Sequence, residues 1–390
     1  MEPSLDQPKT KRKISRRDFL KLAGAGLLLA AGADLVIVYT KDQKERERGG
    51  KVAVLDMFDI RGQNTIDFDG DTKQIINNSF GNEYGGHGET VSAVMNKLKF
   101  NTNEPQEQIS IVSAVKIGEE AIDKVGNKTV NLEITEKEII KLIGQTESGT
   151  INMSFEVGKI PVTIVTKQEK LKNPSAPLPG ITRIGSTEIY KDELGNKISI
   201  DKFNEMRRIA SEKIIVDAPE NKRVVVFLDG YAGENTYDNL LAMTNIAAKF
   251  PDKTFIVAGG NPKYLNGLHT PDIREARVRL EKANLWPENL IVVGFQYHGD
   301  GIVAPASLGA DIYVSDKDLE EMGFFGASSF ATPVITEIVS ALKKSGVKNW
   351  KDILLDGLTE NNEFWNNNEK IDYKVLNLGK SKELLLTGRL

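Results

Sequence analysis

Hydrophobic positions along the chain fall into two alternating kinds of segment. Short continuous apolar runs, typical of buried strands, occupy residues 52–55, 109–112, 151–155, 254–258, 290–293 and 310–314. Other segments have apolar residues every three or four positions, which predicts helices over residues 89–98, 136–142, 239–250 and 333–344. Strands that alternate with helices favour parallel pairing, so the pattern predicts an α/β fold with a mainly parallel sheet.

One long stretch breaks this alternation. Residues 157–228 combine polar segments of mixed pattern with a proline-rich loop at 172–180. We therefore expect a single large domain over residues 50–390, with an inserted subdomain at about 157–228.

The N-terminal part, residues 1–49, has a different character. A basic segment at 11–21 is followed by an apolar run at 22–33, which is the arrangement of an export signal. The pair Arg16-Arg17 within it resembles a twin-arginine signal, which implies export of the folded protein by the twin-arginine translocase.

Two fates of this signal stay open. Small residues at 31–33 form a candidate cleavage site, and cleavage there would release a periplasmic or extracellular protein. Apolar residues continue at 35–39, so an uncleaved signal would instead tether the protein to the membrane. Residues 41–50 are highly charged, end in Gly49-Gly50 and are expected to be a solvated linker.

Composition limits the chemistry available to the domain. The 390 residues are 40% hydrophobic and 27% charged, as in ordinary globular proteins. A net charge of -4, from 51 basic and 55 acidic residues, gives no reason to expect a nucleic-acid partner. The absence of cysteine excludes disulfides, thiolate metal sites and a cysteine nucleophile. A histidine base must be His87, His269 or His298, and we expect the last two to lie in loops.

A cluster of small residues precedes the last predicted helix. The segment GASSFATP, residues 326–333, places two serines just before Pro333, which is expected to begin the helix. Backbone N–H groups at a helix start can stabilise an oxyanion, so a serine here could act as a nucleophile. Serines in this position are also ordinary helix caps, and the segment alone does not decide between the two.

Two other segments supply the partners that a serine nucleophile needs. His87 lies between glycines at the start of a predicted helix, and Asp56 ends the first apolar strand. Parallel sheets bind ligands at the carboxyl ends of their strands, where Asp56 is expected. Together with a serine, these residues form a nucleophile, a base and an orienting carboxylate.

The order of these motifs resembles that of the subtilisin-like serine peptidases. Besides the three segments above, the similarity includes IVAGGN at 256–261, INMSF at 151–155, LIVVG at 290–294 and GADIY at 309–313. It covers roughly residues 50–156 and 236–345. The family pattern Ser-x-Ala-x-Pro, counted back from Pro333, assigns the nucleophile to Ser329 rather than Ser328.

The resemblance implies a three-layer αβα fold and a serine endopeptidase that acts on polypeptides through an acyl-enzyme, with no required cofactor. Ser329 would attack the peptide carbonyl, His87 would take its proton, and Asp56 would orient the imidazole. Asn261 would complete the oxyanion hole. Substrate would bind extended along two strand ends, formed by Ser154, Phe155, Glu156, Ala258, Gly259 and Gly260.

Several positions depart from the family pattern. Met57 and Phe58 replace a small residue and a glycine, Glu89 and Thr90 replace the usual Thr-His, and Ala327 stands where glycine is common. These changes keep open a second reading, a catalytically silent subtilisin-like fold that serves as an exported binding protein. A third reading is an unrelated α/β binding protein with chance motif matches, which requires the triad residues to lie far apart.

One acidic segment suggests a metal. Asp67, Asp69 and Asp71 surround a glycine, and closely spaced carboxylates suit calcium. The bidentate glutamate of an EF-hand is absent from its expected position, so a solvated acidic turn is the competing interpretation. The sequence leaves the oligomeric state open.

Overall fold

The computed structural model describes most of the chain from residue 43 onward. The described residues are 43–56, 58, 65–68, 71–76, 87–98, 100, 105–111, 115–122, 128–155, 157–166, 223–226, 236–261, 272–299, 302–324, 326–366 and 368–387. The chain divides into two compact units, Met1–Glu47 and Arg48–Leu390. Residues 43–47, the described part of the first unit, are helical. All the described strands belong to the second unit.

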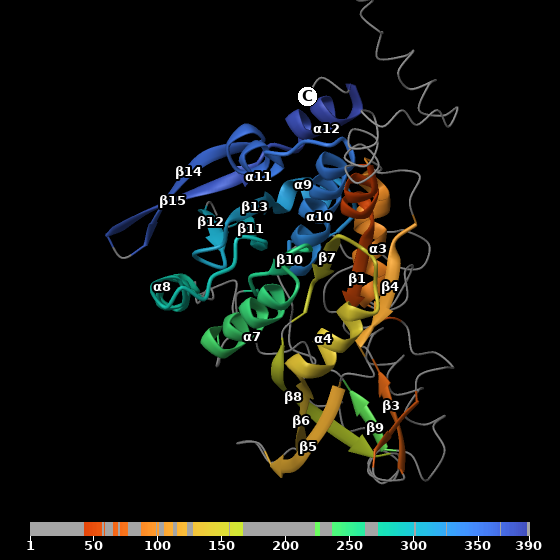
Figure 1. The fold of residues 1–390 in the computed structure, drawn as a ribbon. Helices are drawn as coiled ribbons and strands as arrows, with labels where there is room; N and C mark the ends of the chain where they lie inside the picture. The colour runs from red at the N-terminus through yellow and green to blue at the C-terminus, as the bar shows by residue number, and fades with distance from the viewer. Residues whose placement is uncertain are drawn as a thin grey trace, which may run out of the picture. The chain divides into compact units, whose positions relative to one another are not determined.

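The main sheet is mostly parallel (Figure 1). Its nine described strands run in the order β14 (Thr359–Asn366), β15 (Glu369–Leu376), β13 (Ile312–Ser315), β11 (Leu290–Gly299), β10 (Thr254–Ala258), β7 (Thr150–Met153), β1 (Val52–Asp56) and β4 (Glu107–Ser110), with β12 (Ile302–Ala306) paired to β11. Every pair from β15 to β4 is parallel, whereas β14–β15 and β11–β12 are antiparallel. The prediction of an α/β fold with a mainly parallel sheet is confirmed.

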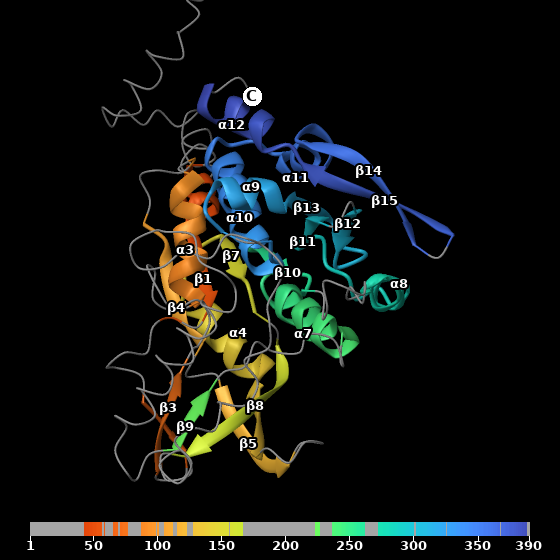
Figure 2. The same cartoon turned by 180° about the vertical axis from the view of Figure 1, so that it is seen from behind.

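Helices cover both faces of this sheet (Figures 1 and 2). Because strand side chains alternate between faces, Leu55 of β1 packs in one core cluster and Val54 in the other. The Leu55 cluster includes residues of α4 (Glu136–Gly144), α7 (Thr236–Lys249) and α8 (Arg274–Lys282). The Val54 cluster includes residues of α3 (His87–Leu98) and α10 (Ser328–Lys344). The arrangement is compatible with a three-layer αβα fold.

Shorter elements complete the C-terminal third. They are α9 (Asp316–Glu321), α11 (Trp350–Asp352), the π-helical turn Ile353–Gly357 and α12 (Leu378–Thr387). Of these, α9 lies between β13 and α10 in the chain, so it leads directly into the serine-bearing helix.

A second sheet has six described strands from separate parts of the chain. Their order is β2 (Thr65–Phe68), β3 (Asp71–Ile76), β9 (Arg223–Val226), β8 (Gly158–Thr166), β6 (Lys128–Ile134) and β5 (Val115–Ile122). Only β8 and β9 come from the expected insertion at 157–228, and residues 167–222 lie outside the described residues. The second sheet therefore also takes strands from residues 65–76 and 115–134.

The helix predicted over residues 333–344 begins five residues earlier, at Ser328. The carbonyl of Ala327 accepts the N–H groups of Phe330 and Ala331, and Thr332 Oγ1 donates to the carbonyl of Ser328 at 2.7 Å. Proline in a helix lacks only its own N–H, so Pro333 leaves the carbonyl of Ser329 without a helical donor but does not end the helix. The prediction that Pro333 begins the helix was wrong, and both serines lie inside its first turn.

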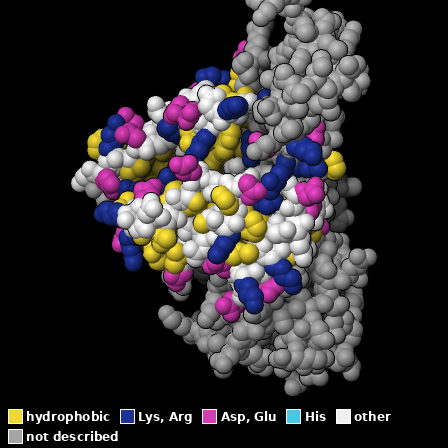
Figure 3. Space-filling model, in the orientation of Figure 1, with side chains coloured by type: hydrophobic (Ala, Val, Ile, Leu, Met, Phe, Trp, Pro, Cys, Tyr) yellow, Lys and Arg dark blue, Asp and Glu magenta, His cyan; other side chains and the backbone are white. Residues whose placement is uncertain are grey.

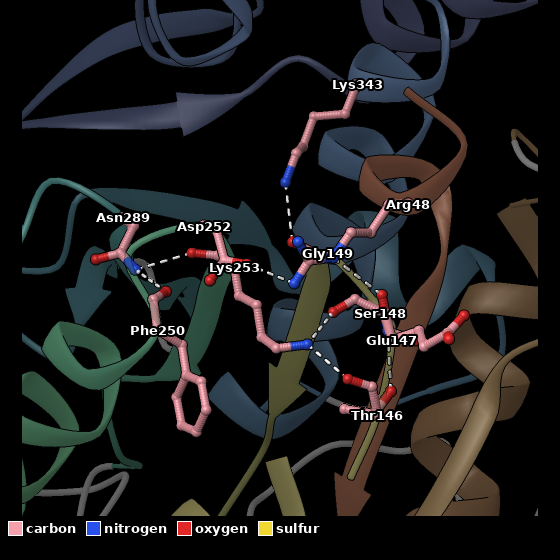
Figure 4. A network of polar contacts seen from close by, with 10 residues as sticks. All are labelled: Arg48, Thr146, Glu147, Ser148, Gly149, Phe250, Asp252, Lys253, Asn289 and Lys343. Carbon is pink, nitrogen blue, oxygen red and sulfur yellow. Dashed lines mark hydrogen bonds and ion pairs between the residues drawn. The ribbon is translucent and has the colours of Figure 1, made fainter. Parts of the chain in front are cut away.

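Cationic side chains close the amino edge of the main sheet (Figure 4). Lys253 precedes β10 and donates to the carbonyls of Thr146 and Ser148, both at 2.8 Å. These carbonyls lie just after the end of helix α4, where no following helical turn provides N–H donors for them. Burial lowers the pKa of Lys253.

Lys343 and Arg48 extend this network along the same edge (Figure 4). Lys343 Nζ, on α10, donates to the carbonyl of Gly149 at 2.9 Å and to Thr254 Oγ1 at 3.0 Å. Arg48 donates to the carbonyl of Glu147 and forms an ion pair with Asp252 at 2.5 Å. The network ties the start of the second unit to the amino ends of β7 and β10.

The described surface carries mixed charge. On the face drawn in Figure 3, basic and acidic side chains are interspersed. Among the residues that the structure describes, no helix combines the length and apolar character needed to cross a membrane. The apolar segments 22–33 and 35–39 of the expected signal lie outside those residues.

Candidate active site

Asp56 and His87 form a hydrogen-bonded pair at the carboxyl edge of the sheet. Asp56 is the last residue of β1 and is 1% exposed, whereas His87 is the first residue of α3. His87 Nδ1 lies 2.7 Å from Asp56 Oδ1. An ionised carboxylate only accepts, so the ring nitrogen that faces Asp56 is the one that carries hydrogen. Nε2 is then the nitrogen that can act as a base.

Phe58, two residues after Asp56, packs against a glycine. Phe58 is buried in the core between the sheet and helices α3 and α10. A Cβ added at Gly88 would lie 2.9 Å from two ring carbons of Phe58. The missing side chain of Gly88 therefore makes room for the phenyl ring beside His87.

The two serines of α10 have different surroundings. Ser328 is 1% exposed, and its hydroxyl donates to Asn261 Oδ1 at 3.0 Å. Ser329 is 8% exposed, and its hydroxyl forms no hydrogen bond with another described residue. Of the two hydroxyls, only that of Ser328 is therefore engaged with another described side chain.

The first turns of α3 and α10 meet next to this serine. The His87 ring stacks on that of Phe330, with centroids 5.9 Å apart and planes inclined by 28°. Phe330 follows Ser329 directly and is fully buried. The structure thus brings Asp56 and His87 into contact and places His87 against the residue next to Ser329. The reading of chance motif matches required these three residues to lie far apart.

Asn261 is held in a fixed orientation at the start of α10. Its Oδ1 accepts the backbone N–H of Ser328 at 2.7 Å in addition to the Ser328 hydroxyl. Because both groups of Ser328 are donors, the amide atom that faces them must be the oxygen, and Nδ2 is free to donate elsewhere. Asn261 follows Gly260, whose φ of +94° favours glycine and whose carbonyl accepts the hydroxyl of Ser307. The turn after β10 therefore presents the amide of an exposed side chain beside the serines.

The expected substrate-binding residues follow two neighbouring strands. Val257 of β10 and Met153 of β7 are paired in parallel, so the residues after them leave the same edge of the sheet. Ser154 is buried and donates to Asn152 Oδ1 at 3.0 Å, so its side chain is already engaged.

The other members of the set differ in exposure. Ala258 and Gly259 are partly exposed, whereas Gly260 is buried. Phe155 is partly buried against the core, and Glu156 lies outside the described residues.

The candidate calcium ligands are described only in part. Asp67 lies on β2 and Asp71 on β3, strands that form an antiparallel hairpin, while Asp69 lies outside the described residues. Among the described residues no group of three or more potential metal ligands occurs.

A second histidine–carboxylate pair was missed by the sequence analysis. His298 does not lie in a loop, as expected, but on β11, which extends six residues beyond the predicted strand. Its Nδ1 lies 2.6 Å from Asp316 Oδ1. The signal was the aspartate itself, because Asp316 directly follows an apolar strand and Asp56 is the last residue of one. His269 lies outside the described residues.

Comparisons of the chain with protein-family models, with curated proteins and with solved structures found no match.

Proposed function

We propose that the protein is a subtilisin-like serine endopeptidase with the triad Asp56, His87 and Ser329. The observation that carries the proposal is the buried Asp56 bonded to His87, whose ring in turn lies against the residue after Ser329. In such a triad the carboxylate orients the imidazole, and the imidazole takes the proton of the serine hydroxyl so that its oxygen can attack. The resemblance of the surrounding motifs to the subtilisin-like family supports the same assignment.

In the proposed reaction Ser329 Oγ attacks the carbonyl carbon of a peptide bond while His87 Nε2 takes the hydroxyl proton. The tetrahedral intermediate collapses, the C–N bond breaks, and His87 returns the proton to the leaving amine. Water then attacks the acyl-enzyme by the same route and releases the carboxylic acid. Asp56 keeps the imidazole in the required tautomer and stabilises the imidazolium in both halves.

The oxyanion of the intermediate would be bound from two sides. Asn261 can donate its Nδ2 hydrogens, because Oδ1 is held by Ser328. The backbone N–H of Ser329 lies in the first turn of α10, where N–H groups lack helical acceptors. Donors placed before the reaction stabilise developing charge without having to reorganise.

The contacts of the two serines favour Ser329 as the nucleophile. The Ser328 hydroxyl would have to leave Asn261 in order to attack, and Asn261 Oδ1 would then keep only the backbone N–H of Ser328. Ser329 has no such engagement among the described residues. We keep export by the twin-arginine pathway as part of the proposal, on the sequence of residues 11–33.

A fluorophosphonate probe, which phosphonylates activated serines, tests the assignment. Folded wild-type protein should be labelled, Ser329→Ala should not, and Ser328→Ala should retain labelling. Ser328→Ala is the matched control because it removes a neighbouring hydroxyl of the same helix turn. Labelling of Ser329→Ala but not of Ser328→Ala would overturn the choice of nucleophile.

The silent binding protein remains the second candidate. The altered residues after Asp56 and His87 motivate it, although Phe58 fits against Gly88 without disturbing the pair. This candidate predicts that folded wild-type protein is not labelled at all, a result that would remove the peptidase proposal.

A further inference from the structure

The carboxylate of Asp316 is bound twice by a single residue. His298 Nδ1 lies 2.6 Å from Oδ1, and the backbone N–H of His298 donates to Oδ2 at 2.7 Å. Asp316 is 1% exposed, so this carboxylate depends on His298 for its stabilisation. Because Gln296 of β11 pairs with Ser315 of β13, His298 and Asp316 lie just beyond this parallel pairing, at the carboxyl edge where β1 ends in Asp56.

The connection between α9 and α10 lies directly against Asp316. A Cβ added at Gly326 would lie 2.8 Å from Asp316 Cβ and 3.0 Å from Phe295 Cε2. The backbone at Gly326 thus touches Asp316 with no side chain between them. Ala327 comes next and its carbonyl begins the hydrogen bonds of α10, so the first turn that holds Ser329 starts one residue after the contact.

A second anchor holds the same connection from the side of α3. Lys97 Nζ, in the last turn of α3, donates to the carbonyl of Met322 at 2.7 Å. The same amino group lies 5.1 Å from the centroid of the Phe324 ring, which packs 5.8 Å from that of Phe330. One anchor therefore belongs to the helix of His87, and the other is Asp316.

We propose that His298 and Asp316 are positioning residues, whose pairing holds the connection between α9 and α10 so that Ser329 faces His87. This inference rests on the proposed peptidase function. His298 donates to Asp316 from its ring and from its backbone, Asp316 supports Gly326, and Gly326 sets where α10 begins. Neither residue is assigned a contact with substrate.

The expected effect is on the chemical step. A displacement of about 1 Å at a reacting group costs about 10²-fold in rate. Breaking the pair should therefore lower the maximal rate of Ser329 modification, kinact, by about tenfold to a hundredfold. The concentration dependence, KI, reflects probe binding and should change by less than about threefold, because the pair makes no proposed contact with the probe.

The test measures kinact and KI for a fluorophosphonate on the full chain, with folded protein quantified by circular dichroism. The variants are Asp316→Ala, Asp316→Asn and His298→Gln. Asparagine keeps one oxygen that can accept the backbone N–H of His298, so Asp316→Asn should retain more of the rate than Asp316→Ala. Should Asp316→Ala fail to fold, the other two variants decide.

Asp311→Asn is the matched control. Asp311 Oδ2 accepts the backbone N–H of Val292 at 2.8 Å, and Oδ1 pairs with Arg277 at 2.8 Å, but this carboxylate precedes β13 at the opposite edge of the sheet. Asp311→Asn should lower thermal stability while leaving kinact unchanged. Support for positioning is a loss of kinact in the Asp316 and His298 variants that the control does not show.

Other outcomes overturn the inference. Wild-type kinact in folded His298→Gln and Asp316→Asn would show that the pair serves stability alone, while the peptidase proposal would stand. A rise in KI with unchanged kinact would assign the pair to ligand binding instead of positioning. Absence of labelling in the wild-type protein would overturn the proposed function and this inference together.

Discussion

Asn261 and Ser328 are joined by two hydrogen bonds, both to the same side-chain oxygen. The backbone N–H and the hydroxyl of Ser328 donate to Asn261 Oδ1 at 2.7 Å and 3.0 Å. This contact links the end of β10 to the start of α10 and fixes which end of the amide faces outward. It makes the proposed oxyanion donor a part of the structure that holds the nucleophile.

The role of Asn261 as a donor can be separated from its role as an acceptor. Asn261→Asp retains an oxygen for Ser328 but loses the Nδ2 donor, whereas Asn261→Ala loses both. We expect Asn261→Asp to lose about 10²–10³-fold in the rate of peptide hydrolysis while keeping its thermal stability. Wild-type hydrolysis by Asn261→Asp would exclude Nδ2 as an oxyanion donor.

Asp56→Asn should disable the base without removing it. An amide in place of the carboxylate favours the wrong tautomer of His87, and such a change costs about 10⁴-fold in comparable triads. The prediction is checked by the hydrolysis rate near pH 7, measured on protein whose circular dichroism matches the wild type. A loss of less than about tenfold would argue that Asp56 does not orient His87.

Gly88 and Phe58 should be energetically coupled. The Cβ of Gly88→Ala would lie 2.9 Å from the Phe58 ring, so the substitution should cost about 1–3 kcal/mol in the free energy of unfolding. In a Phe58→Leu background the clash is relieved and alanine gains helix propensity, so the same substitution should cost less. Urea denaturation of the four proteins measures the coupling, and additive effects would contradict the contact.

Lys343 should make stability depend on pH in the alkaline range. Burial, together with the neighbouring charge of Arg48, lowers the pKa of Lys343 from 10.5 to about 8. Between these values the unfolded chain binds more protons than the folded one, so stability rises with pH from about 8 to 10.5.

Lys343→Met removes this dependence. The free energy of unfolding of the wild type minus that of Lys343→Met should be constant below pH 8 and should rise across this range. The rise should be about 2 kcal/mol, less than the full shift implies because the side chain is only partly buried. A difference that stays flat up to pH 11 would contradict the lowered pKa.

The parts of the fold that could be predicted are those whose pattern is local. The apolar run that ends in Asp56 and the helical period after His87 both correspond to the observed elements, β1 and α3. The start of α10 was predicted at Pro333, because proline often begins a helix. In the structure the helix begins earlier, where the carbonyl of Ala327 accepts two N–H groups, and the sequence does not show these hydrogen bonds. Proline position alone does not identify the first turn of a helix.

Some residues of the candidate site could be proposed from the sequence, and others could not. Asp56 and His87 could be proposed together because each lies in a recognisable motif at the end of a strand or the start of a helix. His298 lies on β11 and Asp316 directly follows β13; these strands are neighbours in the sheet, but β12 lies between them in the chain. The apolar pattern shows neither that β11 and β13 are neighbours in the sheet nor that β11 extends to Gly299, so that contact could not be inferred.

Peptide-bond hydrolysis by three matched proteins shows whether Ser329 is the nucleophile of a peptidase. Wild type, Ser328→Ala and Ser329→Ala are incubated with a denatured fluorescein-labelled polypeptide, and new amino termini are counted. We expect cleavage by the wild type and by Ser328→Ala, and loss of cleavage in Ser329→Ala and after fluorophosphonate treatment. Equal cleavage by Ser329→Ala, or no cleavage by folded wild type, would contradict this prediction.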